Sequence, residues 1–355
     1  MLDPFTWSKV PWSSVQRPLL VVIVDTEAEF VWGSKAPRKA VGVSSAKKLE
    51  LTQRIFDKFD CRPTYVLDFP VSSRDESFRP VRELVASGRC EIGAHLQPWD
   101  NPPMVEALDE FNSYPGNLPP ELERAKLVLL TDTIEGNVGR RPRIYKAGRY
   151  GVGPATEMIL AELGYEIDAS VVPGTDLRRF LGPDFRRCGV EPYWFGRYGR
   201  LLELPLTVGF TGLFARSGVA IYQFASALRM TRLRVPGILA HLGLLDRITL
   251  TPEGVELPDL CRLTKALLRT GQRIFSFTYH SSSLVAGNTP YVRTSADLEG
   301  FLERIESYLE FFMGEIGGAA ATPFEVRALA ARLSDQHGSS GLMPASALQN
   351  AHSAE

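Results

Sequence analysis

The sequence predicts an α/β fold in which parallel strands alternate with helices and close into a distorted barrel. Residues 19–24 are six apolar, β-rich residues without alternation, which is typical of a parallel strand covered on both faces. Strand-like and helix-like segments then alternate along most of the chain. Polar residues follow several of the predicted strands, as they do at the carboxyl-terminal rim of a parallel barrel.

A doubly wound open sheet is the alternative arrangement of the same elements. Such sheets usually carry a glycine-rich turn after the first strand, which holds a dinucleotide or a phosphate. No such turn follows residues 19–24. The sequence therefore favours the barrel.

The helices and strands can be assigned in order from apolar spacing and capping residues. Residues 44–59 place apolar side chains on one stripe behind a serine cap. Residues 79–87 are expected to form a helix that stops at Gly88, and residues 120–137 one that begins at two prolines and stops before Gly139. The other predicted helices are 154–163, 218–232, 259–270 and 295–313. The other predicted strands are 63–69, 91–99, 143–147, 165–172, 201–208 and 274–279.

The chain is expected to form a lead-in, one large domain and a tail. Residues 1–17 are irregular, and we expect them to fold back and bury Trp7 and Trp12. Residues 18–333 are expected to form a single barrel domain with a surface insertion near 174–200. Residues 334–355 are small and polar, and we expect them to be disordered.

Composition limits the class of protein. The 355 residues include 40 basic and 41 acidic side chains, a balance that gives no indication of a nucleic acid or an anionic membrane as partner. The four cysteines contain no CxxC pair, which argues against a disulfide framework and a cysteine-rich zinc site. No apolar run reaches the roughly 18 residues of a membrane span. The N-terminus lacks the features of a secretory signal, so a cytoplasmic location is expected.

Polar residues at successive strand ends form a candidate hydrolytic site. In a barrel they would converge on one rim. Together they could supply a carboxylate that takes a proton from water, ligands for a divalent cation, an arginine that orients a carboxylate, and a histidine that protonates a leaving group. An aspartate beside that histidine would keep it charged. The residues are Asp25, Glu27, His95, Gln97, Arg149, Asp168, Ser170 and His280.

Several of these residues also have an interpretation without catalysis. Asp25 could cap a helix or a turn, His95 could be a hydrogen-bonded core residue, and Glu27 could be a surface acid. Arg149 could belong to a structural ion pair. Ser170 lacks the Gly-x-Ser-x-Gly surroundings of a nucleophile and is expected in a turn or cap.

The order of these segments and their residue types resemble the five signature motifs of polysaccharide deacetylases, the NodB-homology fold of carbohydrate esterase family 4. The resemblance covers residues 19 to about 290. The Asp-x-Ser-x-x-Pro piece of the fourth segment and the Trp-x-x-Pro-Pro piece that begins at Trp99 are similar to those of a divergent subgroup sometimes called WalW-like. The five segments are Asp25-Thr26-Glu27, His95-Leu96-Gln97-Pro98-Trp99, Lys146-Ala147-Gly148-Arg149-Tyr150, Asp168-Ala169-Ser170-Val171-Val172-Pro173 and Tyr279-His280-Ser281-Ser282.

The resemblance implies a catalytic role for four matching residues. Asp25 would be the base and His280 the general acid. Arg149 would hold the base, and Asp168 would be the partner of the acid. The reaction would be the attack of water on an N-acetyl or O-acetyl carbonyl.

The resemblance also implies a divalent metal, with zinc as the expected ion and Glu27, His95 and Gln97 as ligands. The family usually offers two histidines in the second motif, whereas this chain has Gln97 at one such position. A neutral amide oxygen is a poor zinc ligand, and Trp99 cannot ligate. The site is therefore either Glu27, His95, Gln97 and water, or absent, as in metal-free amidohydrolases that share the fold.

The sequence thus predicts a hydrolase that removes acetyl groups from a glycan or sugar conjugate by metal-assisted attack of water. One alternative is a metal-independent amidohydrolase acting on non-peptide C–N bonds. Another is a catalytically lapsed carbohydrate-binding protein of the same fold. The arginines of residues 174–200 could form an ordinary surface or, with Tyr193 or Trp194, hold an anionic sugar.

Overall fold

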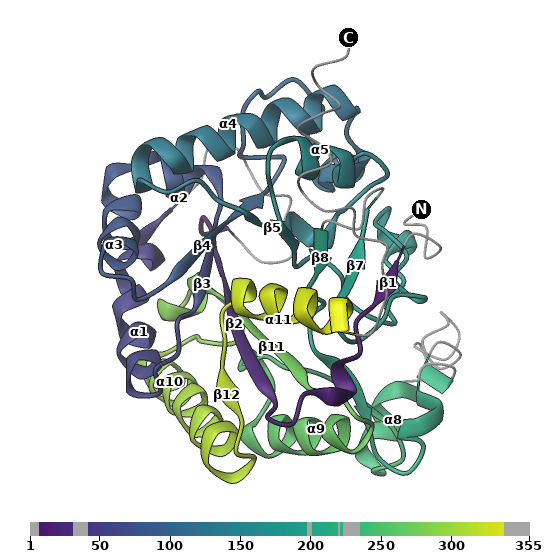
Figure 1. The fold of residues 1–355 in the computed structure, drawn as a ribbon. Helices are drawn as coiled ribbons and strands as arrows, with labels where there is room; N and C mark the ends of the chain where they lie inside the picture. Colours follow the sequence, from purple (N-terminus) through teal and green to yellow (C-terminus); the bar gives the residue numbers. More distant parts are fainter. Residues whose placement is uncertain (1–6, 31–41, 197–200, 219–220, 223–234, 337–355) are drawn as a thin grey trace.

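The computed structural model describes residues 7–30, 42–196, 201–218, 221–222 and 235–336 (Figure 1). The helices are α1 Leu49–Lys58, α2 Phe69–Ser73, α3 Asp75–Ala86, α4 Pro120–Val138, α5 Thr156–Glu162, α8 Val235–His241, α9 Leu257–Arg269, α10 Ser295–Glu310 and α11 Pro323–Gln336. The strands are β1 Ser8–Lys9, β2 Leu19–Thr26, β3 Thr64–Leu67, β4 Glu91–Leu96, β5 Ile144–Ala147, β6 Ile167–Asp168, β7 Tyr193–Phe195, β8 Leu201–Glu203, β9 Val208–Thr211, β10 Asp246–Thr249, β11 Ile274–His280 and β12 Ala319–Ala320.

Most of the described strands belong to one curved sheet with the order β1-β7-β8-β6-β5-β4-β3-β2-β11, in which β12 also pairs with β2. In this order, the seven strands β8, β6, β5, β4, β3, β2 and β11 run parallel to one another. Strand β7 is antiparallel to both β1 and β8. Helices such as α1, α4, α9 and α10 surround the sheet (Figure 1). The predicted α/β fold with a parallel barrel-like sheet is confirmed.

Alternate residues of each strand are buried on opposite faces of the sheet. Val21, Ile23 and Ile144 point into the barrel and share one apolar cluster. Their chain neighbours Val22 and Tyr145 point outward and belong to the larger cluster that includes the helices. Because side chains alternate with a period of two, this parity also decides which polar residues at the strand ends can reach the rim of the barrel.

The amino-terminal end of the barrel is closed by the lead-in and the last helix. Trp12 is buried as expected, and its indole N–H donates to the Pro192 carbonyl over 2.7 Å. Helix α11 lies across β2 and β11 in Figure 1, and its Val326 and Ala330 join the interior cluster. Apolar side chains therefore fill this end, and the opposite end is left for polar groups.

The barrel is distorted where β8 meets β11, because no ladder of described residues joins these two strands. Isolated hydrogen bonds instead link β11 to Thr207, which precedes β9, and to Leu250, which follows β10. The amide of Ser276 donates to the Thr207 hydroxyl over 2.8 Å, and the amide of Leu250 donates to the Thr207 carbonyl over 2.8 Å. The amide of Thr278 in turn donates to the Leu250 carbonyl over 3.2 Å.

Several boundaries differ from the predictions. The predicted strand 201–208 is split into β8 and the start of β9, and only two residues of the predicted strand 165–172 form β6. The insertion 174–200 contains β7, whose three residues are too few to show the alternation of apolar and polar side chains by which a strand is recognised in a sequence. Helix α11 was not predicted. Most of the predicted helix 218–232 and most of the predicted disordered tail lie outside the described residues.

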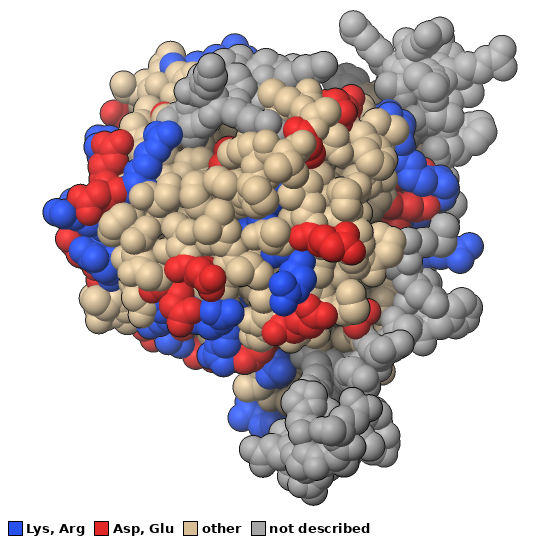
Figure 2. All heavy atoms as spheres, turned by 90° about the horizontal axis from the view of Figure 1, so that it is seen from above, with Lys and Arg blue, Asp and Glu red and all other residues tan. Residues whose placement is uncertain are grey.

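Within the described ranges, no helix has the length and apolar character needed to cross a membrane. On the face shown in Figure 2, Lys and Arg side chains are interspersed with Asp and Glu. A cytoplasmic location stays a prediction.

Replacing Trp12 with alanine should lower the free energy of unfolding by about 3–5 kcal/mol, because a buried aromatic side chain and a hydrogen bond are lost. Urea unfolding measures this. The matched control is Trp7→Ala, since Trp7 is only half-buried and stacks on Tyr193 with ring centroids 4.6 Å apart. Equal, small losses in both variants would contradict a role for Trp12 in closing the barrel.

Candidate functional site

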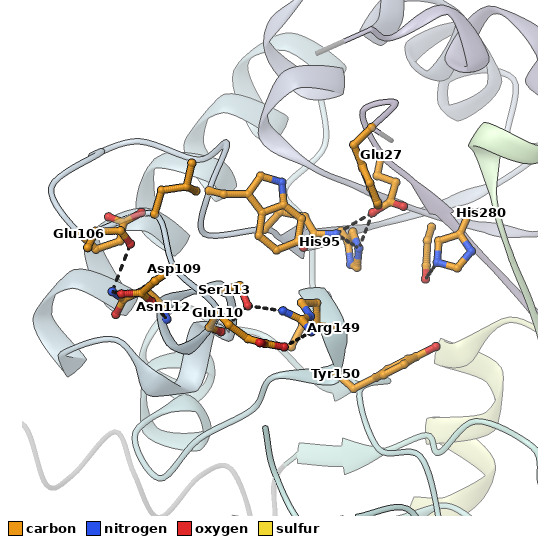
Figure 3. Close-up of a pocket in the computed structure, with 17 residues that line it drawn as sticks. Glu27, His95, Glu106, Asp109, Glu110, Asn112, Ser113, Arg149, Tyr150 and His280 are labelled. Atoms are coloured by element: carbon orange, nitrogen blue, oxygen red, sulfur yellow. Dashed lines mark hydrogen bonds and ion pairs between the residues drawn. The ribbon is translucent and has the colours of Figure 1, made fainter. Parts of the chain in front are cut away.

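The polar rim of the barrel is formed by strand-end residues that share the inward parity. Asp25 is the last residue but one of β2, His95 lies on β4, Lys146 lies on β5 and His280 ends β11. They lie at or beside a pocket of about 430 Å³ that Asp25, His95 and His280 line. Figure 3 shows Glu27, His95 and His280 facing this pocket. The structure thus brings together most of the predicted residues.

Asp25 is paired with Lys146. The Lys146 ammonium donates to both Asp25 carboxylate oxygens, over 2.6 and 2.7 Å, and to the Thr278 hydroxyl over 3.1 Å. Both charged side chains are buried. Burial raises the pKa of Asp25, but the charge and hydrogen bonds of Lys146 and the charge of His280 outweigh it, so this pKa lies below its ordinary value. Asp25 is therefore a carboxylate at neutral pH.

His280 is held by Glu253, which sequence reasoning missed. His280 Nδ1 lies 2.8 Å from Glu253 Oε2, and the His280 amide donates to Glu253 Oε1 over 3.2 Å. The Ser283 hydroxyl donates to the same carboxylate. Burial opposes the charged imidazole, but the charge and hydrogen bond of Glu253 raise the pKa of His280 to about 10. Nothing in the local sequence Thr-Pro-Glu-Gly marks Glu253 as a site residue.

The two paired units meet at the rim. His280 Nε2 lies 3.6 Å from Asp25 Oδ2. A carboxylate held by an ammonium therefore faces an imidazolium held by a second carboxylate. This arrangement places a proton acceptor and a proton donor at one pocket.

The three predicted metal ligands also lie together. Glu27 Oε2 and His95 Nε2 are 3.3 Å apart. The amide nitrogen of Gln97 is 2.6 Å from Glu27 Oε2 and 3.2 Å from His95 Nε2. His95 Nδ1 lies 3.0 Å from the Lys146 carbonyl, which fixes the ring.

This donor set does not fit a zinc site. Gln97 turns its N–H groups toward Glu27 and His95, and an amide N–H cannot ligate a cation. Catalytic zinc usually takes three His, Cys, Asp or Glu ligands, and no group of three such residues among the described ranges could hold an ion. The Gln97 oxygen packs against Gly148, where a Cβ would overlap it.

Arg149 does not hold Asp25. It follows β5 in the short turn Gly148–Tyr150, where its φ is +53°. Its guanidinium donates to the Ser113 hydroxyl and lies 3.4 Å from Glu110 Oε1 (Figure 3). It also lies over the Tyr114 ring. The turn directs Arg149 along the pocket wall. Lys146, three residues earlier, instead lies beside Asp25, where Arg149 was expected.

Asp168 does not reach His280. On β6 its neighbours Ile167 and Ala169 point into the barrel, so the Asp168 side chain points to the outer face. It pairs in register with Glu203 of β8 and accepts a hydrogen bond from Ser170. Burial raises the pKa of Asp168 to about 7. Strand parity therefore separates Asp168 from the rim, and Glu253 is the partner of His280.

One wall of the pocket is a loop anchored by Lys126 of α4. The ammonium is buried and donates to the carbonyls of Pro98, Asn101 and Pro103 over 3.0, 2.5 and 2.9 Å. The following residues 106–113 contribute side chains to the pocket lining, as does Trp99. Because a buried cation needs its partners, Lys126 fixes where this wall begins.

Comparison with known proteins bears on the fold. No protein-family model matches the sequence, and no curated protein matches it. A candidate polysaccharide deacetylase from Mycobacterium smegmatis has a similar solved structure, with a TM-score of 0.53, 16% identity and coverage of 97% of this chain and 97% of that chain. A candidate polysaccharide deacetylase from Pseudomonas aeruginosa PAO1 gives a TM-score of 0.50, 12% identity and coverage of 90% and 91%. The chain therefore has the fold of these proteins.

The pKa of His280 should fall when Glu253 is replaced with glutamine. In the parent the imidazole should titrate near pH 10, and in Glu253→Gln several units lower, as NMR of the ring protons can measure. Because the folded-state value exceeds the unfolded one of about 6.5, the stability from this pair is present below pH 6.5 and is lost as pH rises through 10.

The stability difference between parent and Glu253→Gln should therefore shrink between pH 6.5 and 10, from a few kcal/mol toward zero. Glu256→Gln is the control, since Glu256 is exposed and pairs with Arg304. An unchanged His280 titration in Glu253→Gln would show that Glu253 does not hold this ring.

Proposed function

We propose that the protein is a hydrolase that removes an acetyl group from a glycan or sugar conjugate. The observation that carries the proposal is the approach of Asp25 and His280 to 3.6 Å at the pocket. The shared fold with the two candidate deacetylases and the five motif-like segments support it. Membership of the WalW-like subgroup stays a prediction from the Asp-x-Ser-x-x-Pro and Trp-x-x-Pro-Pro pieces.

Asp25 and His280 have complementary roles in this reaction. Asp25 takes a proton from water as the water oxygen attacks the acetyl carbonyl. His280, held charged by Glu253, donates its Nε2 proton to the departing amine or hydroxyl as the carbonyl–heteroatom bond breaks. Products are acetate and the free sugar amine or alcohol. The proton on Asp25 can return to His280, because the two groups are neighbours.

The aromatic side chains of the pocket suit a sugar. Phe30, Trp99 and Tyr150 line it beside the acid and base, and aromatic rings stack on the apolar faces of sugar rings. Burial raises the pKa of Tyr150, so its hydroxyl stays protonated and can donate a hydrogen bond. No step uses a metal, because the Glu27, His95 and Gln97 donor set does not fit one.

A metal-independent amidohydrolase is the second candidate. It would act on a small amide with the same acid and base, and the hydrogen bond from the Gln97 amide to Glu27 suits it equally, because neither reaction uses a metal. A catalytically lapsed carbohydrate-binding protein would instead bind glycans and release no acetate.

Acetate release from N-acetylated and O-acetylated oligosaccharides tests the function. Asp25→Asn and His280→Ala should each lower kcat/KM by about 10²–10⁴, the usual contribution of a general acid or base. Binding of the same oligosaccharides should persist in both variants. Parent protein that binds glycans but releases no acetate from any of them would favour the lapsed binder.

The pH dependence should identify the partner of the acid. Glu253→Gln should move the alkaline limit of kcat/KM to lower pH, because His280 loses the carboxylate that keeps it charged. Asp168→Asn should leave this limit in place, since Asp168 faces away from the rim. The opposite pattern would return Asp168 to the role implied by the motif resemblance.

A further inference from the structure

We propose that the amide N–H groups of Gln97 and the ammonium of Lys146 take the place of a divalent cation at the rim. Because these groups already stabilise the carboxylates there, the site does not bind zinc. The proposal concerns the same site as the proposed function, but it can be tested without activity.

The Gln97 amide bridges the two residues that would be ligands. Because the Lys146 carbonyl can only accept, His95 Nδ1 must carry the hydrogen of their 3.0 Å contact. In its neutral form His95 accepts at Nε2 from the Gln97 amide, 3.2 Å away, while the other amide hydrogen is donated to Glu27 Oε2 over 2.6 Å. The two hydrogens of one NH₂ group thus serve the carboxylate and the imidazole.

The reverse orientation of the amide is unfavourable. It would bring the Gln97 oxygen to the place of the nitrogen, 2.6 Å from a carboxylate oxygen of Glu27. Two acceptors at that distance repel each other, and hydrogen-bond partners decide the orientation of an amide. Glu27 is buried, so no bulk water competes for this position.

Lys146 supplies a full positive charge. Its ammonium binds Asp25 through both carboxylate oxygens, and its carbonyl fixes the His95 ring. Asp25 and Glu27 therefore each have a donor from the chain itself. A divalent cation added beside Glu27 would lie close to this buried ammonium, and the repulsion between like charges would weaken its binding.

The site is nevertheless one ligand away from a metal centre. Two ligands of a tetrahedral zinc lie about 3.3 Å apart, given bond lengths near 2.0–2.1 Å. Glu27 Oε2 and His95 Nε2 are 3.3 Å apart. Residue 97 lies two positions after His95, with the same inward parity. Replacing its amide with a ligand should therefore create the centre.

Calorimetric titration of metal-stripped protein with zinc chloride is the test. The parent should show no one-to-one binding, whereas Gln97→His and Gln97→Glu should each bind one zinc at least about 100-fold more tightly, or 2.7 kcal/mol. Gln97→Glu preserves the size of the side chain and keeps the test valid if Gln97→His misfolds. Asn112→His is the control, because it adds a histidine to the pocket lining away from Glu27.

One-to-one zinc binding by the parent that disappears in Glu27→Ala and His95→Ala would overturn the proposal. Absence of binding in both folded Gln97 variants would also overturn it, because Gln97 would then not be the cause. Absence of acetate release would contradict the proposed function and would leave the zinc result unaffected. If acetate is released, the rate should be unchanged by a chelator.

Discussion

The buried ion pair between Lys146 and Asp25 is the interaction on which the rest of the site depends. Removing two charges from water is costly unless each is well partnered, and here both carboxylate oxygens and the Thr278 hydroxyl accept from one ammonium. The pair joins β5 to β2, which are separated in the sheet by β3 and β4. It therefore requires the curvature of the barrel, and it places the carboxylate beside His280.

Strand parity assigns two environments to the acids of this chain. Asp25 shares the inward face with Lys146 and stays ionised, whereas Asp168 shares the outer face with Glu203, where burial raises the pKa of both carboxyls. The same residue type is thus an ion-paired carboxylate at the rim and a buried, hydrogen-bonded group behind the sheet. Both aspartates lie near a strand end, so their position along the strand does not distinguish them. The charged groups beside each aspartate do.

The shared fold does not by itself carry a metal mechanism, because folds host many chemistries and function lies in the site. This chain keeps a carboxylate and an imidazole at the spacing of two zinc ligands, yet a glutamine amide joins them. The proposed acid and base, His280 and Asp25, are both charged through partners within the chain. If the proposed function holds, hydrolysis without a Lewis acid depends on how well the pocket orients substrate and water.

The sequence alone determined the alternation of strands and helices, the long helix α4, and the positions of Asp25, His95 and His280 at strand ends, because apolar runs and caps are local signals. It did not determine their partners. Lys146 rather than Arg149, Glu253 rather than Asp168, and the orientation of the Gln97 amide were decided by strand register, parity and barrel curvature. Lys146 is 121 residues from Asp25 along the chain, and no local pattern encodes a contact across that separation.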